Sequence, residues 1–462
     1  MSFLRPTFPY PARIPSWFAG HMSRSLRELP SLLENIDLVI EARDARLPLT
    51  SMNPTFETML NRARKGKGKE REKVVVYTKR DLAEKRYEEP LKKAFLEHAG
   101  QRVMFADTRS DKDVKDILKY AVRIAKDNAE TIPDLRVLVV GMPNVGKSSL
   151  LNALRRVGVR KGKAFRTGAE AGITRKLTGT VRIYDDPSVY VYDTPGVMLP
   201  FLGRGEDGAE KGLKLALTAG IKESLFEQDA MVDYLLWKMN KRLIIESELL
   251  DDDPNKHQSY LSLLPLPKDF EPTDHLPTLL DALSDRLGAL KKGGERDHEA
   301  ASAFLIRSFR EGKLGGYTLD DLILPINQLA PTPTSHEDEG NGDHLLNTLS
   351  IPSNDTVYPP SFSEVESIPA PISIPQSGNL DYQVSQAVKA YLSQSKETNP
   401  SISSDSLNQQ KKANKRVKLE ERDAKLRAKG VNVPVRQWGE RNSKLSKKSR
   451  SGEAGKFARS RR

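Results

Sequence analysis

The chain has 462 residues and a net charge of +12, with 37% hydrophobic and 29% charged residues. This length predicts about three units, and the absence of cysteine excludes disulfides and thiolate-bound zinc. No apolar run approaches the ~18 residues that would cross a bilayer, so we expect no transmembrane segment and a chain that is soluble or peripheral to a membrane. We also expect a monomer.

The positive charge is concentrated in the C-terminal tail. Residues 411–462 hold 19 Lys and Arg against 5 Asp and Glu, a balance of +14, so the remaining residues together carry −2. A tail of this kind would bind RNA largely through counterion release. It is also compatible with a solubilising segment or with a nuclear-import signal at 411–418.

Residues 1–25 form a separate N-terminal segment. Arg5, Arg13 and Arg24 precede the first acidic residue, Glu28, and mitochondrial transit peptides share this bias. Four prolines between positions 6 and 15 disfavour an amphipathic helix. An ordinary frayed terminus is therefore an equally good interpretation.

Strand and helix patterns alternate through residues 26–205. Apolar runs predict strands at 36–41, 74–77, 103–105, 137–140 and 189–192. Helical spacing begins at Leu26, Leu29, Leu32 and Leu33 and recurs at 87–98 and again up to about residue 128. The alternation predicts an α/β fold with a doubly wound parallel sheet, in which ligands bind at the carboxyl ends of the strands.

Strand patterns stop near residue 206. Helical spacing then predicts a small all-α domain at 206–330, with a loop-rich insertion at 246–300 where an acidic run and several prolines occur. Residues 331–405 are rich in Ser, Thr, Pro and Asn, which predicts a disordered linker. The basic tail occupies 406–462 and is partly capable of forming helix.

A glycine-bearing loop joins the strand at 137–140 to a helix. Its sequence, Gly141-Met142-Pro143-Asn144-Val145-Gly146-Lys147-Ser148-Ser149, fits G-x-x-x-x-G-K-[ST], in which backbone N–H groups surround phosphate oxygens at a helix N-terminus. Lys147 would reach the β- and γ-phosphates and Ser148 would ligate Mg²⁺. The phosphate contacts would be completed by Asn144, Val145, Gly146 and Ser149. A tight turn with a chance lysine is the alternative.

The strand at 189–192 ends in Asp193-Thr194-Pro195-Gly196. Asp193 would hold a Mg²⁺-bound water, and the Gly196 N–H would meet the γ-phosphate. Thr174 is the candidate for a second Mg²⁺ ligand that responds to the γ-phosphate and is released on hydrolysis. The alternatives are a plain Pro-Gly turn and a surface threonine.

The strand at 74–77 ends in Thr78-Lys79-Arg80-Asp81. An ionised Asp81 would accept both donors on one edge of guanine, while the Lys79 stem would pack on the base plane. Asp107 and Thr108 end the next strand, where a backbone contact to guanine O6 is expected. A helix N-cap is the alternative role for Asp81. Because this guanine-reading loop precedes the phosphate loop, the order of motifs indicates a circular permutation.

These motifs, in this order, resemble the circularly permuted GTPases of the YlqF/YawG class, in particular its bacterial ribosome-biogenesis and mitochondrial branches. The resemblance covers about 1–330 and includes four further motifs: Trp17-Phe18-Ala19-Gly20-His21-Met22, Asp44-Ala45-Arg46-Leu47-Pro48, Gly172-Ile173-Thr174 and residues 309–315. Ala19 stands where the family usually has Pro. Thr78 replaces the usual Asn of the guanine loop, which would weaken base affinity.

The resemblance implies Mg²⁺-dependent GTP hydrolysis coupled to assembly of the large ribosomal subunit, with the helical domain binding ribosomal RNA. Arg307, Arg310 and Lys313 would supply phosphate contacts, although three such charges are also typical of a solvated helix face. The mitochondrial branch implies the matrix, with peripheral association at the inner membrane. Nucleolar or cytosolic ribosomes are the alternative location, and a non-hydrolysing RNA-binding scaffold is the alternative function.

Val197 directly follows Gly196, at the position where Ras-like enzymes have a glutamine that orients the attacking water. The resemblance implies His21 in that catalytic role, and a structural histidine that caps the following helix is the alternative. It also implies that Asn144 ligates a monovalent cation such as K⁺, which would supply positive charge in place of an arginine finger.

Overall fold

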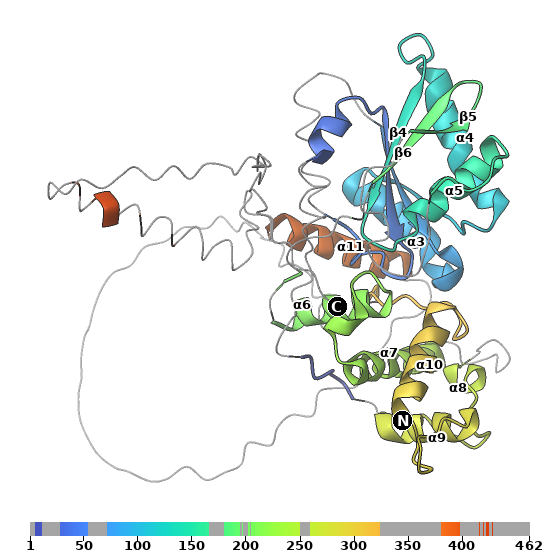
Figure 1. Cartoon of the computed structure of the whole chain (residues 1–462), viewed down its shortest axis with the longest axis vertical. Coiled ribbons are helices and arrows are strands. Elements are labelled where there is room, and N and C mark those ends of the chain that lie inside the picture. The colour runs from blue at the N-terminus through green and yellow to red at the C-terminus, as the bar shows by residue number, and fades with distance from the viewer. Residues whose placement is uncertain are drawn as a thin grey trace, which may run out of the picture. The chain divides into compact units, whose positions relative to one another are not determined.

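The computed structural model describes residues 5–11, 28–53, 72–165, 180–194, 196, 202–203, 205–249, 259–323 and 380–397, with residues 415, 419, 422–424 and 427 in the tail. The chain divides into two units, residues 1–403 and residues 404–462. Every labelled strand and helix belongs to the first unit, in which a sheet region adjoins a helical region (Figure 1).

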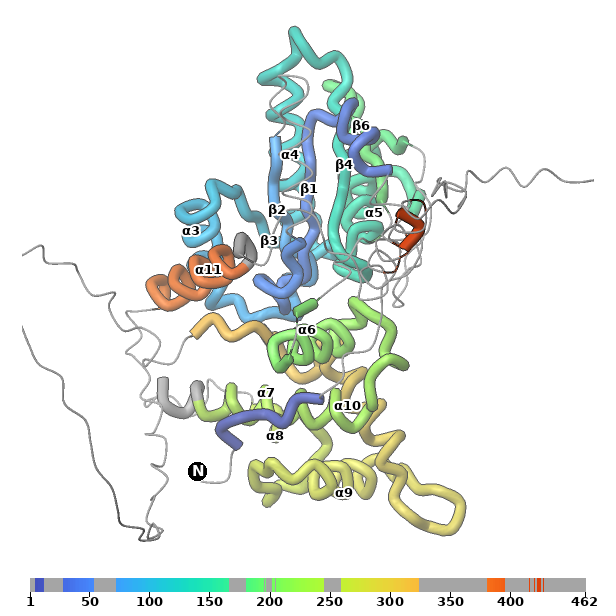
Figure 2. The backbone as a smooth tube through the Cα atoms, turned by 90° about the vertical axis from the view of Figure 1, so that its left-hand side faces the viewer, coloured from blue at the N-terminus to red at the C-terminus, as the bar shows by residue number. Residues whose placement is uncertain are grey.

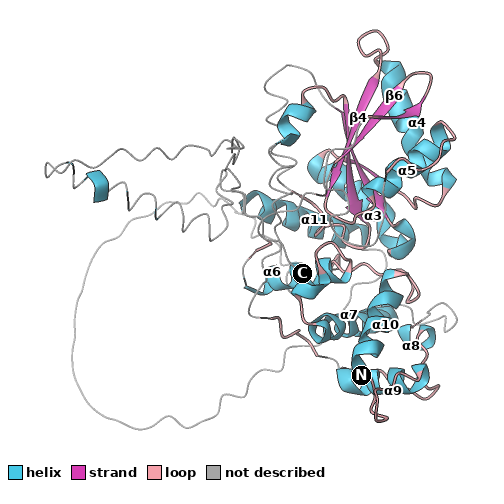
Figure 3. Cartoon of the chain, in the orientation of Figure 1, coloured by secondary structure: helices cyan, strands magenta, loops and turns pink. Residues whose placement is uncertain are grey.

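A six-stranded sheet forms the first region. Its strands are β1 (Leu38–Asp44), β2 (Glu72–Thr78), β3 (Arg102–Phe105), β4 (Leu135–Gly141), β5 (Val181–Tyr184) and β6 (Val189–Asp193). They lie in the order β3-β2-β1-β4-β6-β5, and every pair is parallel except β5 with β6 (Figure 3). The predicted parallel sheet is confirmed. The edge strand β5 was not predicted, because its four residues are too few to show a clear alternation.

The inner strands β1, β2 and β4 are largely buried on both faces, as parallel strands covered by helices should be. In β1, Leu38 and Ile40 belong to one apolar cluster, whereas Val39 belongs to another on the opposite face with Leu29 and Leu33. Strand β2 alternates in the same way between two clusters. Near-continuous apolar runs in the sequence are therefore explained by helices on both sides.

Three helices follow β2, β3 and β4. They are α3 (Glu88–Ala99), α4 (Asp111–Asp127) and α5 (Lys147–Gly158), with short 3₁₀ turns at Arg80–Leu82 and Lys85–Tyr87. Side chains of α4 and α5 share one cluster with the sheet, and those of α3 share a cluster on the opposite face. Helix α4 begins where the Ser110 hydroxyl accepts from the Asp113 N–H, as expected of an N-cap.

The second region is helical, as predicted. It contains α6 (Gly205–Leu217), α7 (Gln228–Leu249), α8 (Tyr260–Leu263), α9 (Leu276–Leu287) and α10 (His298–Arg310), with a 3₁₀ turn at Glu223–Leu225. In the stretch predicted to be a loop-rich insertion, 246–300, the described residues hold α8 and α9, joined and followed by non-helical residues at 264–275 and 288–297. Helix α9 has Pro277 in its first turn, buries Leu279, Leu280 and Leu283, and ends at Gly288 in the left-handed conformation.

The structure also corrects one part of the disordered linker predicted at 331–405, because residues 380–397 form the helix α11 (Leu380–Glu397). Val384 and Val388 are fully buried in the cluster that contains Leu91 and Phe95 of α3, and Figure 2 shows the two helices side by side. The low-complexity composition of the long window hid a short apolar stripe at helical spacing. That stripe is covered only in the tertiary structure.

Residues 5–11 lie across the helical region, so the prediction of a frayed terminus is wrong for them (Figure 2). The Arg5 guanidinium pairs with the Asp233 carboxylate at 2.7 Å, and the Trp237 indole N–H donates to the Arg5 carbonyl at 3.1 Å. Phe8 is 5% exposed and its ring centre lies 5.3 Å from that of Tyr234. Aromatic side chains between the prolines thus anchor this segment. Among the described helices, none has the length and apolarity of a membrane span.

Candidate nucleotide-binding site

The phosphate loop joins the central strand β4 to α5, as predicted. Gly141 (φ 149°), Asn144 (φ 55°) and Gly146 (φ 90°) adopt left-handed conformations that L residues with larger side chains rarely take. A Cβ on Gly141 would lie 2.2 Å from the Ala42 carbonyl oxygen of the neighbouring strand. The glycine therefore allows the loop to leave the sheet, and α5 begins directly at Lys147 with its N-terminal N–H groups directed into the loop.

Lys147 is buried beneath this loop. Its Nζ donates to the Met142 carbonyl at 2.8 Å, so the ammonium lies inside the curve of the backbone. Burial lowers the pKa of Lys147 to about 8, partly opposed by the charge of Asp193. A buried cation beside a helix N-terminus is suited to bind phosphate oxygens.

Asp193 lies at the carboxyl end of β6, next to the phosphate loop. The Ser148 hydroxyl donates to Asp193 Oδ2 at 2.8 Å, and Asp193 Oδ1 is buried without a hydrogen-bond partner among the described residues. Burial raises the pKa of Asp193, opposed by Lys147 and by the Ser148 hydrogen bond. Carboxylate and hydroxyl oxygens are the ligands that Mg²⁺ prefers, together with nucleotide phosphates. The residues present therefore fit a Mg²⁺ ion.

Thr194 and Gly196, which follow Asp193, hold this segment against β4 and the phosphate loop. The Thr194 hydroxyl donates to the Val139 carbonyl of β4 at 2.7 Å. A Cβ on Gly196 would lie 2.5 Å from Pro143 Cα, so only glycine allows this approach. The two loops predicted to share the γ-phosphate are thus in direct contact.

The guanine loop begins at the end of β2 and touches the phosphate loop. Thr78 Oγ1 lies within hydrogen-bonding distance of the Arg43 and Val145 carbonyls. Lys79, at φ 55°, donates from Nζ to the Asn144 carbonyl at 2.6 Å and to Asp44 Oδ2 at 2.9 Å. The threonine that replaces the usual asparagine thus still connects the two loops.

The base-reading end carries an arginine that the sequence analysis missed. Arg109 pairs with the Asp81 carboxylate through Nη2 and with Asp107 through Nε at 3.1 Å. Burial and the neighbouring charge of Asp107 raise the pKa of Asp81, and Arg109 opposes this. The Thr108 carbonyl accepts from Arg156 at 3.3 Å. A search for charges within a few residues of Asp107 would have found Arg109.

Two predicted catalytic residues, His21 and Thr174, lie outside the described residues. Of the three predicted RNA contacts, Arg307 and Lys313 are exposed. Arg310 is not available in the same way, because its guanidinium donates to the Leu217 and Ala216 carbonyls at 2.7 and 2.8 Å. It also pairs with Glu223 at 2.7 Å. The helix-face pattern placed Arg310 correctly on α10 but could not show its partners.

This arrangement defines the class of protein. A phosphate loop at the central strand, a buried carboxylate at the end of β6 and a base-reading loop at the end of β2 meet at one edge of the sheet. Because the base-reading strand precedes the phosphate loop in the chain, the domain is a circularly permuted P-loop nucleotide-binding domain.

Comparison with known proteins identifies the family. Residues 136–257 match the family described as 50S ribosome-binding GTPase. Mitochondrial ribosome-associated GTPase 1 of Xenopus tropicalis is 32% identical over 337 residues, covering 69% of this chain and 98% of the relative. Mitochondrial GTPase 1 of Schizosaccharomyces pombe is 32% identical, covering 70% and 94%. Ribosome biogenesis GTPase A of Bacillus cereus is 29% identical, covering 66% and 93%.

The chain belongs to this family of circularly permuted GTPases. It is a GTPase that binds and hydrolyses GTP.

Proposed function

We propose that this GTPase is an assembly factor or checkpoint for the large ribosomal subunit of mitochondria, located in the matrix with peripheral association at the inner membrane. The observation that carries the proposal is the near-complete match, over 98% and 94% of their lengths, to relatives named for mitochondria, one of which is named for the ribosome. The helical region follows the switch strand β6 in the chain, so a change at the γ-phosphate can alter the domain that would contact RNA.

Each end of the site has a proposed task. Lys147 and the α5 N-terminus would hold the β- and γ-phosphates, while Asp81 would select guanine. Ser148, Asp193 and Thr174 would hold Mg²⁺, which when bound neutralises phosphate charge. His21 would place the attacking water, since Val197 has no polar group to orient it. Asn144 would bind K⁺, which would supply positive charge in place of an arginine finger.

The RNA contacts of this proposal come from the basic tail, Arg307 and Lys313. Deleting 411–462 should weaken RNA binding and flatten its salt dependence by ~0.7 to 0.9 in log–log slope for each phosphate that the shortened chain no longer neutralises. Binding titrations between about 50 and 300 mM KCl, a range over which counterion release changes affinity strongly, would measure this slope. An unchanged slope would show that the tail is solvated rather than bound.

The main experiment is cosedimentation of the full chain with mitochondrial and with cytosolic large subunits, in GDP and in a non-hydrolysable GTP analogue. We expect preference for the mitochondrial subunit and stronger binding with the GTP analogue. Equal or stronger binding to cytosolic subunits would support the nucleolar or cytosolic alternative. A single-turnover assay with and without subunits separates the enzyme from a non-hydrolysing scaffold.

A stimulated rate that disappears in His21→Ala, with GTP binding retained, would support the role of His21. Measuring the same rate in K⁺ and in Na⁺ tests the cation. A full stimulated rate in His21→Ala would show that the histidine is structural and that the ribosome places the water.

A further inference from the structure

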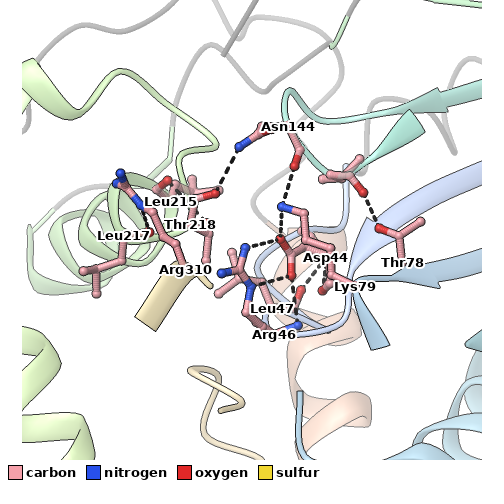
Figure 4. A network of polar contacts seen from close by, with 12 residues as sticks. Asp44, Arg46, Leu47, Thr78, Lys79, Asn144, Leu215, Leu217, Thr218 and Arg310 are labelled. Carbon is pink, nitrogen blue, oxygen red and sulfur yellow. Dashed lines mark hydrogen bonds and ion pairs between the residues drawn. The ribbon is translucent and has the colours of Figure 1, made fainter. Parts of the chain in front are cut away.

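Asn144 of the phosphate loop is joined to the helical region by two separate routes, and Figure 4 shows the first route and the second as far as Arg46. Its backbone is left-handed at φ 55°, a conformation that Asn tolerates better than most residues but that persists only when neighbours hold it. Its side-chain amide leads to α6, and its carbonyl leads to the guanine loop. Both routes end at α10.

The first route passes through the C-terminus of α6. Asn144 Nδ2 donates to the Thr218 carbonyl at 3.4 Å. Thr218 directly follows α6, whose chain turns away through Ala219 in the left-handed conformation. The last carbonyls of the helix, those of Ala216 and Leu217, accept from the Arg310 guanidinium at 2.8 and 2.7 Å. Arg310 therefore fixes the end of α6 that presents the Thr218 carbonyl to Asn144.

The second route passes through a buried chain of charges. Lys79 Nζ donates to the Asn144 carbonyl at 2.6 Å and to Asp44 at 2.9 Å. Asp44 accepts from the Arg46 guanidinium at 2.8 and 3.0 Å, and these cations hold the pKa of Asp44 well below its usual range despite burial. The guanidinium of Arg46 lies 5.5 Å from the centre of the Phe309 ring.

Phe309 and Arg310 are consecutive residues at the end of α10, so the two routes form a closed ring around Asn144. We infer that Arg310 is a positioning residue of the GTPase site, which acts through the α6 C-terminus to hold Asn144 and thereby the phosphate loop. This assigns to Arg310 an intramolecular role in nucleotide binding instead of an RNA contact. It also makes the helical region part of the nucleotide site.

The test compares nucleotide binding by full-length Arg310→Ala, Arg310→Lys and a control, Arg286→Ala, in which an exposed arginine near the end of α9 is removed. Dissociation of fluorescent GTP and GDP is measured together with thermal unfolding. We expect Arg310→Ala to release nucleotide roughly tenfold faster, within the range of coupling between linked sites. Arg310→Lys should be intermediate, because one ammonium cannot donate as a planar fork to two carbonyls.

A double-mutant cycle with Asn144→Ala separates positioning from a general loss of structure. If Arg310 acts through Asn144, adding Arg310→Ala to Asn144→Ala should change release by less than about twofold. Full additivity of the two substitutions would overturn the inference, as would equal losses in Arg286→Ala. Unchanged nucleotide release combined with loss of ribosomal-subunit binding would assign Arg310 to RNA instead. If Arg310→Ala does not fold, the cycle is run with Arg310→Lys.

Discussion

The two ends of the nucleotide site differ in their exposure to solvent. At the phosphate end, Lys147 and Asp193 are 6% and 1% exposed. Lys147 donates to the Met142 carbonyl of the same loop, and Asp193 accepts from the Ser148 hydroxyl. At the base end, the Asp81 and Arg109 side chains are 26% and 72% exposed, and Arg109 pairs with both Asp81 and Asp107. Electrostatic interactions are stronger where water is excluded. The phosphate end should therefore determine rate and affinity, and the base end should determine selectivity.

The largest effect is expected from Lys147→Ala. It removes the buried cation that faces the phosphates, so hydrolysis should fall by about 10²–10³-fold or more. The fold should remain, because the lysine carries a charge that burial disfavours and supports no apolar cluster. Single-turnover hydrolysis and thermal unfolding measure the two effects. Loss of the folded state, or near-normal hydrolysis, would contradict the assignment of the phosphate loop.

The next effect is expected from Asp81→Asn. Loss of a charged acceptor should weaken GTP binding by about 10- to 100-fold. Binding of xanthine nucleotides should improve in parallel, because their position 2 carries a carbonyl that the amide can match. Competition titrations with GTP, XTP and ATP measure the preference. Wild-type protein that binds ATP as tightly as GTP would show that Asp81 does not read the base.

A pH titration sharpens the comparison at the phosphate end alone. Burial places the pKa of Lys147 at about 8, and phosphate favours its charged form, so nucleotide binding above pH 8 must take up a proton. GTP affinity should therefore fall as pH rises above 8, by up to about tenfold per pH unit. The control is Lys147→Met, in which the fall in GTP affinity above pH 8 should disappear. An identical profile in both proteins would place the titrating group elsewhere.

The smallest effect is expected from Arg109→Ala at the base end. An exposed ion pair contributes about 0 to 1 kcal/mol, so GTP affinity should change by less than about fivefold. Hydrolysis of bound GTP should stay unchanged. The same binding and single-turnover assays apply. A change as large as that of Lys147→Ala would show that the two ends do not differ as their exposure indicates.

Much of the phosphate end could be predicted from the sequence, because its geometry depends on local spacing. A strand, two glycines and a lysine before a helix allow few other backbone paths, and the structure places Gly141, Gly146 and Lys147 accordingly. Asp81 and Asp193 could be placed for a related reason, since the ends of neighbouring parallel strands share one edge of a sheet. The permuted order of motifs was likewise readable from the sequence.

The partners of long side chains and the packing of isolated helices were decided only by the tertiary structure. Arg310 looked like an exposed cation, yet it donates to carbonyls of a helix that ends 93 residues earlier in the chain. The sequence of α11 has too few apolar residues to indicate that this segment folds. Its apolar stripe is buried because α3 presents a matching apolar face. Sequence spacing specifies local backbone geometry, whereas the contacts of a flexible side chain or a short amphipathic helix depend on which surface the rest of the chain brings to it.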